Sequence, residues 1–130
     1  MNKKRILLVD DEKDMVFALK LHLEADGYDV LTAFDGQEAL QKARQDQPDL
    51  IILDVMLPKL DGYKVCRMLK FDRKYKAIPV VMLTAKSQEG DVKLGYEVGA
   101  DFYVTKPFES KTLLLKVKDI LEGKTPYGPS

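Results

Sequence analysis

The sequence is poor in the residues that make covalent cross-links, membrane spans and secretion signals. Its 130 residues include one cysteine, Cys66, so an internal disulfide is excluded and a reducing compartment is expected. No apolar run approaches the roughly 20 residues that cross a bilayer. The basic start, Met1–Arg5, is followed by too few apolar residues before Asp10 to form a signal-peptide core. These absences predict a cytoplasmic protein without a membrane partner.

Net charge, histidine and glycine-rich phosphate loops are also missing or scarce. Lys+Arg and Asp+Glu both number 21, so the formal charge is zero and there is no basic field to attract nucleic acid. The single histidine, His22, lies in a helical stretch and is expected to be a solvated helix residue. No G-x-G-x-x-G or P-loop pattern appears, which argues against a nucleotide- or flavin-binding module.

Five short apolar segments predict β-strands. Several are continuous apolar runs rather than alternations, which is typical of strands covered on both faces of a parallel sheet. Between them, apolar residues recur three and four apart, as on the buried face of a helix. The predicted strands are Arg5–Val9, Asp29–Ala33, Leu50–Leu53, Pro79–Leu83 and Asp101–Thr105. The predicted helices centre on Met15–Leu23, Ala39–Ala43, Val65–Leu69, Val92–Gly99 and Leu113–Leu121.

This order is a strand–helix unit repeated five times. It predicts an α/β fold of the (βα)5 type: a doubly wound, five-stranded parallel sheet with helices on both faces. One domain is expected over residues 1–123. Residues 124–130 are rich in Pro and Gly and are expected to be a flexible tail or the stub of a linker. Both a stand-alone protein and the front of a longer one fit this pattern.

Charged residues stand where three of the predicted strands end. Asp10 and Asp11 follow the first strand, Asp54 follows the third and Lys106 follows the fifth. Ligands of open α/β sheets bind outside the carboxyl ends of the strands, so these groups are expected at one rim. Each aspartate alone fits a helix cap or a solvated loop charge. Together, three carboxylates would repel one another unless a hard cation such as Mg²⁺ or Mn²⁺ joined them.

The same rim has the groups that phosphoryl transfer requires. The carboxylate of Asp54 can accept a phosphoryl group as an acyl phosphate. The ammonium of Lys106 and a bound metal would neutralise the phosphoryl oxygens. Thr84 stands at the end of the fourth predicted strand, directly after Leu83, and its hydroxyl can hydrogen-bond a phosphoryl oxygen there.

The chain resembles the receiver domains of bacterial two-component response regulators. The resemblance covers roughly residues 3–122, and its motifs occur in the order and spacing of that family. A single fragment would be a weak signal, but the conjunction is specific. The matching segments are Ile6–Glu12, Leu53–Gly62, Val80–Ala85 and Gly99–Phe108.

The resemblance implies a role for each residue of the rim. Asp54 would be the phosphoacceptor, and Lys106 and Thr84 would contact the phosphoryl group. Asp11, Asp54 and the carbonyl of Met56 would bind Mg²⁺ directly, with Asp10 acting mainly through water. The other implied features are phosphoryl-binding backbone amides at Met56 and Ala85, a switch formed by Thr84 and Tyr103, a loop shaped by Pro58 and Gly62, and a cis Lys106–Pro107 peptide.

The resemblance also implies the sheet order, the partners and the working cycle. The order would be the flavodoxin-like 2-1-3-4-5. A histidine kinase or phosphotransfer protein would donate the phosphoryl group. The switch would then alter the face of the fourth helix, fifth strand and fifth helix, to which an effector would bind. The protein would be a signalling phosphoacceptor and not an enzyme that acts on outside substrates.

Two departures refine this picture. Many related domains dimerise through charge pairs on that face, but Phe102 and Thr112 replace two of the charges. A monomer or a weak phosphorylation-dependent dimer is therefore expected. The charges that remain are Lys93, Glu97, Asp101 and Lys116, while Phe102 and Leu115 are either ordinary packing residues or apolar surface for another partner.

The resemblance also implies that Met56 and Lys86 would flank the path of water to the acyl phosphate. Because Met56 cannot activate water, we expect slow autodephosphorylation. An aspartyl-phosphate hydrolase of the haloacid-dehalogenase type is the alternative that uses similar groups. That class carries an acid/base aspartate two residues after its nucleophile, where this chain has Met56.

Overall fold

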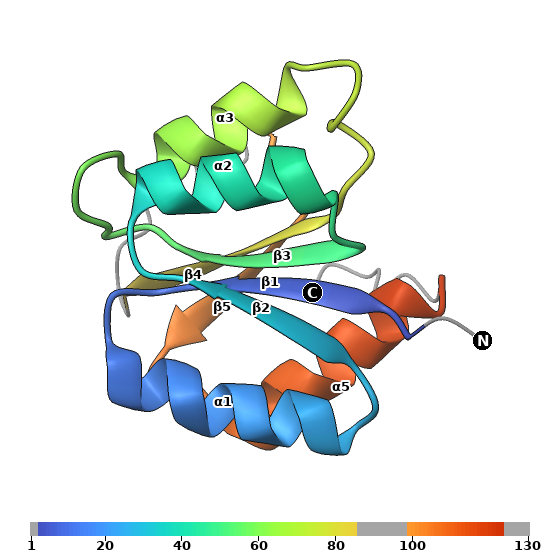
Figure 1. The fold of residues 1–130 in the computed structure, drawn as a ribbon. Helices are drawn as coiled ribbons and strands as arrows, with labels where there is room; N and C mark the ends of the chain where they lie inside the picture. The colour runs from blue at the N-terminus through green and yellow to red at the C-terminus, as the bar shows by residue number, and fades with distance from the viewer. Residues whose placement is uncertain (1–2, 86–98, 124–130) are drawn as a thin grey trace.

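The five predicted strands form one parallel sheet (Figure 1). The computed structural model describes residues 3–85 and 99–123. The strand order is β2-β1-β3-β4-β5, so the predicted doubly wound topology is confirmed. The strands are β1 (Arg5–Val9), β2 (Asp29–Ala33), β3 (Leu50–Asp54), β4 (Val80–Ala85) and β5 (Phe102–Lys106).

Helices cover both faces of the sheet. Figure 1 shows α2 (Gly36–Asp46) and α3 (Gly62–Lys70) on one face, with α1 (Lys13–Ala25) and α5 (Ser110–Leu121) on the other. The helix predicted at Val92–Gly99 lies almost wholly outside the described residues. Lys86, Lys93 and Glu97 also lie outside them.

Alternate residues of each central strand pack into different cores. On β1, Leu7 and Val9 face the helices α2 and α3, while Ile6 and Leu8 face α1 and α5. All four side chains are fully buried. Side chains of a strand point alternately to its two faces, so a strand buried on both faces must be apolar throughout. This explains the continuous apolar runs in the sequence.

The strand ends differ slightly from the prediction. The segment predicted as Asp101–Thr105 is shifted by one residue, so Lys106 closes β5 instead of following it. Asp54 is likewise the last residue of β3. Both functional groups are therefore held by sheet hydrogen bonding, which fixes their backbone more firmly than a loop would.

Two aspartates and a glycine define helix ends near the sheet. Asp35 caps α2 by accepting the Glu38 N–H at 2.8 Å, and Asp61 caps α3 in the same way. A carboxylate at this position satisfies an N–H that has no partner within the helix. Gly27 follows α1 with a φ of 95°, a left-handed conformation that suits glycine.

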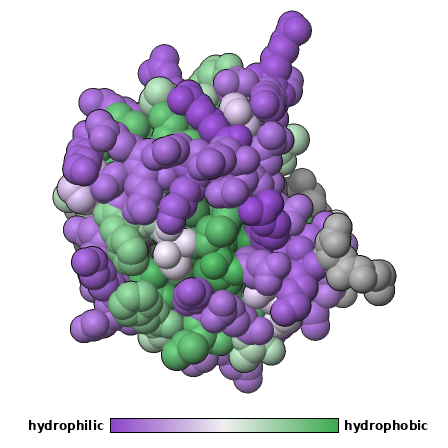
Figure 2. Space-filling view, in the orientation of Figure 1, coloured by the Kyte–Doolittle hydropathy of each residue, from purple (hydrophilic) through white to green (hydrophobic). Residues whose placement is uncertain are grey.

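The surface is mostly hydrophilic, but one apolar band is visible. Figure 2 shows apolar residues between α1 and α2, over the edge strand β2. Half-buried Val30, Leu31 and Phe34 belong to the two cores at this edge. Within the described residues, no helix has the length and apolar character needed to cross a membrane.

Candidate phosphoryl and metal site

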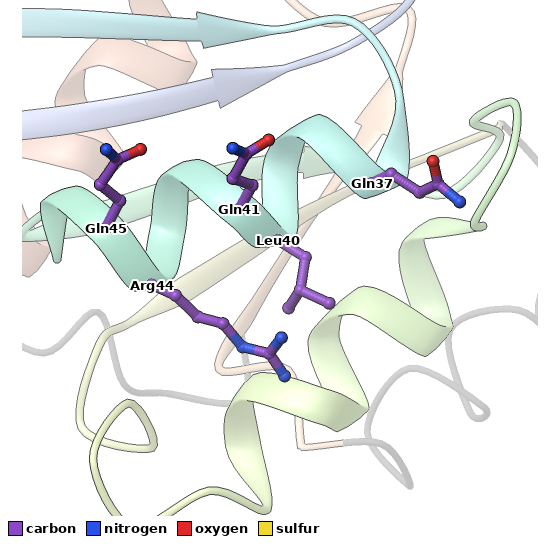
Figure 3. A pocket seen from close by; sticks show the side chains of 5 residues that line it. All are labelled: Gln37, Leu40, Gln41, Arg44 and Gln45. Carbon is purple, nitrogen blue, oxygen red and sulfur yellow. The ribbon is translucent and has the colours of Figure 1, made fainter.

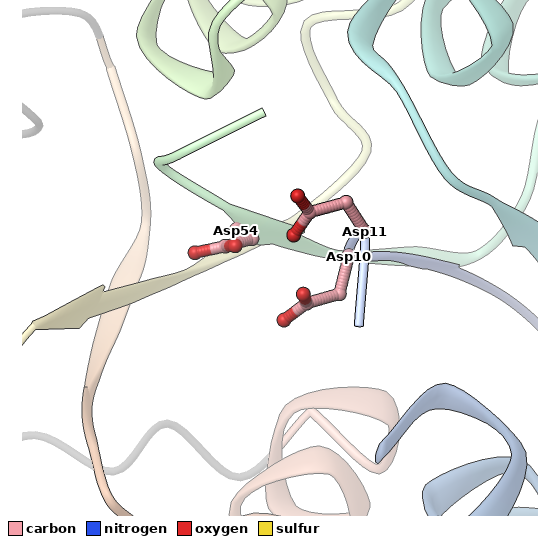
Figure 4. A group of neighbouring side chains, drawn as sticks. All are labelled: Asp10, Asp11 and Asp54. Carbon is pink, nitrogen blue, oxygen red and sulfur yellow. The ribbon is translucent and has the colours of Figure 1, made fainter. Parts of the chain in front are cut away.

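Three carboxylates meet at the carboxyl ends of β1 and β3, which are neighbours in the sheet (Figure 4). One oxygen from each of Asp10, Asp11 and Asp54 lies within 4.8 Å of the others. Asp10 and Asp54 are buried, whereas Asp11 is exposed. The structure thus brings together the acidic groups that the sequence placed 44 positions apart at most, and it leaves one open to solvent.

The ammonium group of Lys106, the last residue of β5, lies beside these carboxylates. Its Nζ lies 2.7 Å from Asp10 Oδ2 and 3.4 Å from Asp54 Oδ2. Asp10 also accepts the N–H of Glu12 at 3.0 Å through its other oxygen. The buried Asp10 carboxylate is therefore paired on both oxygens, which offsets the cost of removing its charge from water.

The pKa values of Asp54 and Lys106 are both raised in this site. Burial raises the pKa of Asp54 from its usual 3.8 to about 6, and the charge of Asp10 adds to this effect. The charge of Lys106 and the N–H of Met56 partly offset the rise. For Lys106, burial lowers the pKa, but the hydrogen bond to Asp10 and the nearby carboxylates outweigh it and raise the pKa. Extra positive charge at this site would therefore favour ionised Asp54.

Thr84 lies beside this group with an unused hydroxyl. It follows Leu83, whose backbone pairs in register with Asp54 on the neighbouring strand. Its Oγ1 is buried and has no hydrogen-bond partner among the described residues. A buried hydroxyl without a partner costs about 1–3 kcal/mol, so a ligand that accepted its hydrogen bond would recover that energy.

Of the other predicted site residues, Met56 and Ala85 lie at or just beyond strand ends on this rim, whereas Tyr103 lies near the start of β5, three residues before Lys106. The Met56 side chain is 72% exposed, and Ala85, the last residue of β4, pairs with Lys106. Tyr103 lies on β5 and packs partly buried against the core on the α2–α3 side. The Lys106–Pro107 peptide, expected to be cis, is cis.

Glu12 is a charged neighbour that the sequence reasoning assigned no role. Its carboxylate lies 3.5 Å from Lys106 Nζ, and its side chain is 66% exposed. An exposed ion pair of this kind contributes little to stability. Its position directly after Asp10 and Asp11 was the only sequence signal for it.

Two charges expected on the dimerisation face have partners inside the molecule. Asp101 pairs with Lys70 of α3 at 2.6 Å and also accepts the Val80 N–H at 2.8 Å. The Lys116 Nζ donates to the carbonyl of Tyr103 at 3.4 Å. These contacts tie Asp101 and Lys116 to their own chain.

The acidic cluster fits a hard divalent cation. Carboxylate oxygens are ligands that Mg²⁺ prefers, and Mg²⁺ commonly keeps several of its waters. The exposed Asp11 leaves a side of the cluster on which such waters can remain. Asp10, Asp11 and Asp54 could therefore hold a metal ion.

A hollow lined by side chains of α2 offers no comparable chemistry (Figure 3). Leu40 and Arg44 point toward α3, and three glutamines lie along the helix. None of the described residues that line this hollow of about 510 Å³ carries a carboxylate. Its lining residues are Gln37, Leu40, Gln41, Arg44 and Gln45.

Comparison with known proteins identifies the family. Residues 6–118 match the response regulator receiver domain. The chain belongs to this family. The receiver domain is 53% identical over 130 residues to the alkaline phosphatase synthesis transcriptional regulatory protein PhoP of Bacillus subtilis. It covers 53% of that relative, so it spans about half the length of the curated protein it matches.

Solved structures support the same assignment. The chemotaxis protein CheY4 of Vibrio cholerae is 34% identical with a TM-score of 0.85, and 92% of this chain covers 99% of that one. The response regulator DrrB of Thermotoga maritima is 36% identical with a TM-score of 0.86. There the alignment covers 95% of the receiver domain but 55% of DrrB. The chain is therefore the receiver domain of a two-component response regulator.

Proposed function

We propose that this receiver domain accepts a phosphoryl group on Asp54 and changes its surface in response. The supporting observation is the arrangement at one rim of a buried carboxylate, a cation on Lys106 and an unpartnered hydroxyl on Thr84. The donor is proposed to be a phosphohistidine on a histidine kinase or a phosphotransfer protein. The receiver domain is a phosphoacceptor in this scheme and does not turn over outside substrates.

The transfer step requires an ionised Asp54. One of its carboxylate oxygens forms a bond to phosphorus as the phosphorus–nitrogen bond of the phosphohistidine breaks. The electron pair of that bond stays on the imidazole nitrogen, which takes up a proton. Lys106, 3.4 Å from the Asp54 carboxylate, would neutralise the negative charge of the transferred group.

Mg²⁺, or Mn²⁺ in its place, is the proposed cofactor. Asp11, Asp54 and the carbonyl of Met56 would hold it directly, and Asp10 would act mainly through water. When bound, the cation supplies positive charge that neutralises phosphoryl oxygens. The backbone N–H groups of Met56 and Ala85 would donate to the same oxygens.

The proposed response begins at Thr84. Its hydroxyl would donate to the phosphoryl group, and Tyr103 would turn inward to fill the space that this movement opens. The effector is proposed to bind where β5 and α5 meet the expected fourth helix. Residues 1–123 would form the receiver domain and 124–130 a tail or linker. We propose that the domain works in the cytoplasm and does not itself bind nucleic acid.

The test is phosphorylation of the purified chain with acetyl phosphate, followed by intact mass spectrometry. We expect one added phosphoryl group in the wild type with Mg²⁺ and none without it. Asp54→Ala should remain unmodified, whereas Asp72→Ala, which removes a half-buried aspartate beyond α3, should react as the wild type does. A wild type that stays unmodified, or an adduct that persists in Asp54→Ala, would overturn the proposal.

A further inference from the structure

The loop that joins β3 to α3 is packed against the first turn of α2. The N–H of Gly36 donates to the carbonyl of Pro58 at 3.3 Å. Lys59 Nζ lies 3.6 Å from Asp35 Oδ2. A Cβ atom at position 36 would come within 1.7 Å of the Leu60 carbonyl oxygen. No side chain fits at this position unless the loop moves.

The same loop holds the backbone next to the phosphoacceptor. The backbone N–H of Met56 lies close enough to the carboxylate of Asp54 to lower its pKa. At the far end of the loop, Gly62 N–H donates to Val55 O at 2.9 Å, and a Cβ there would come within 2.2 Å of Asp54 O. The loop is thus held from the α3 side by Gly62 and from the α2 side by Gly36.

The loop does not rest in its lowest-energy conformation. Lys59 has a φ of 69°, in the left-handed region. For a residue with a Cβ this conformation costs about 1–2 kcal/mol. The contacts with α2 are among the interactions that hold Lys59 and its neighbours in place against this strain, together with the hydrogen bond from Leu60 N–H to the Pro58 carbonyl at 2.8 Å. The ion pair contributes the smaller part, because the Lys59 side chain is 61% exposed and solvent screens it.

We propose that Gly36 is a positioning residue for the Asp54 site. It contacts neither the acidic cluster nor Lys106. Its missing side chain lets the loop approach α2 closely, which places the Met56 backbone against the Asp54 carboxylate. This inference rests on the proposed function, because it assigns a support to that same site.

A side chain at position 36 should distort the Asp54 site, although every residue of that site would still be present. Gly36→Ala would push the Leu60 backbone away by a distance on the order of 1 Å. A misplacement of this size, even from outside the reacting groups, can cost about 100-fold in rate. Binding of a cation that needs near-ideal octahedral geometry should weaken as well.

The experiment compares Gly36→Ala with Gly27→Ala. Gly27 has a φ of 95° and nothing within 4 Å of an added Cβ, so alanine there adds backbone strain without a clash. Calorimetric Mg²⁺ titration and the acetyl phosphate rate are measured on both folded variants. We expect Gly36→Ala to bind Mg²⁺ at least about tenfold more weakly and to react about 100-fold more slowly. Gly27→Ala should match the wild type in both.

A spectroscopic readout is independent of activity. The amide resonances of Met56 and Leu60 should shift in Gly36→Ala, and the Met56 amide should exchange faster with solvent, while Gly27→Ala leaves both unchanged. Equal Mg²⁺ affinity and equal Met56 exchange in the two variants would overturn the inference. If the wild type neither binds Mg²⁺ nor takes a phosphoryl group, the proposed function fails, and the Met56 amide still shows whether Gly36 holds the loop.

A milder variant covers the case in which Gly36→Ala does not fold. Asp35→Asn keeps a good helix cap but removes the charge that pairs with Lys59. We expect its Mg²⁺ affinity to fall about two- to fivefold, as loss of a partly screened ion pair implies. Asp72→Asn removes the same charge near the carboxyl end of α3 and should have no effect. Equal affinities in these two variants would count against the inference.

Discussion

Burial of the ionised Asp54 carboxylate lowers the stability of the folded protein when no metal is bound. Its pKa is about 6 in the folded protein against a usual 3.8, so the folded state holds the proton more tightly. As pH rises from about 4 to 6, the unfolded chain ionises first and stability falls. Because one pKa unit corresponds to about 1.4 kcal/mol, the cost at pH 7 is about 3 kcal/mol.

Asp54→Asn should therefore stabilise the metal-free protein at pH 7 by about 1–3 kcal/mol, and it should have no effect below about pH 4. Urea unfolding at a series of pH values measures the difference. Mg²⁺ should reverse the order, because only the wild type has the full set of carboxylates. A less stable variant at pH 7 would show that the pair with Lys106 outweighs the cost of burial.

Met56 should set the lifetime of the phosphorylated state. Its side chain is 72% exposed two residues after Asp54, and a thioether cannot orient or activate water. Met56→Asn would place an amide there, and we expect faster loss of the phosphoryl group, by about tenfold if one hydrogen bond to water is gained. Decay of the phosphorylated mass peak measures both rates. Equal or slower decay in the variant contradicts this expectation.

At the scale of elements, side chains of α2 hydrogen-bond the outward-facing backbone groups at the β2 edge of the sheet. Ala33 O accepts from Asp10, so alternate residues of β2 face β1, and the backbone groups of Thr32 and Phe34 face outward. Glu38 accepts the Phe34 N–H at 2.8 Å, and Lys42 donates to the Thr32 carbonyl. Glu38 and Lys42 also pair at 3.3 Å. Unpaired edge groups are templates for strand pairing with another chain.

Removing Glu38 and Lys42 should expose the backbone groups at the β2 edge to solvent and to other chains. In Glu38→Ala/Lys42→Ala we expect faster hydrogen exchange at the Phe34 amide and concentration-dependent self-association in sedimentation. The exchanged pair, Glu38→Lys/Lys42→Glu, should behave in the same way, since it keeps both charges but offers the wrong group to each backbone atom. Lys20→Ala/Glu24→Ala on α1 is the control. Wild-type behaviour of the exchanged pair would show that charge alone protects the edge.

For the whole molecule, the question is how a protein donor reaches the rim. Helix α1 begins directly after the acidic cluster and exposes Phe17 (54%) and Leu21 (67%), with Phe17 against the ring of Phe34. Exposed apolar patches beside a site commonly mark a partner surface. Leu115 is similarly exposed (55%) on α5 and provides a matched comparison.

We expect Phe17→Ser to slow phosphotransfer from a histidine kinase about tenfold, in the range of an interface residue that loses more than 1 kcal/mol. Its rate with acetyl phosphate should not change, because a small donor needs no docking surface. Leu115→Ser should leave both rates unchanged. Quench-flow transfer from a phosphorylated kinase measures the first rate, and equal slowing with both donors would contradict docking at α1.

The sequence predicted the parts of this molecule that depend on local pattern. Continuous apolar runs revealed the strands, and charges at their ends indicated the rim of Asp10, Asp54 and Lys106. Contacts between distant segments left no such pattern. The pairing of Asp101 with Lys70 and the approach of Gly36 to Leu60 depend on how layers pack in three dimensions. For this reason the charged residues that meet at the rim could be predicted, and the resemblance implied a role for Gly62 in the loop, whereas the contacts of Gly36 and Asp101 could not be predicted.

The single cysteine gives the chain a built-in reporter of its own opening. Cys66 is fully buried on α3, and burial raises the pKa of its thiol to about 12. Thiol reagents attack the thiolate, so they modify this side chain only when the protein unfolds around it. The rate of labelling in native buffer therefore measures the free energy of opening. A second cysteine placed on the surface could take a fluorophore without competition from the first.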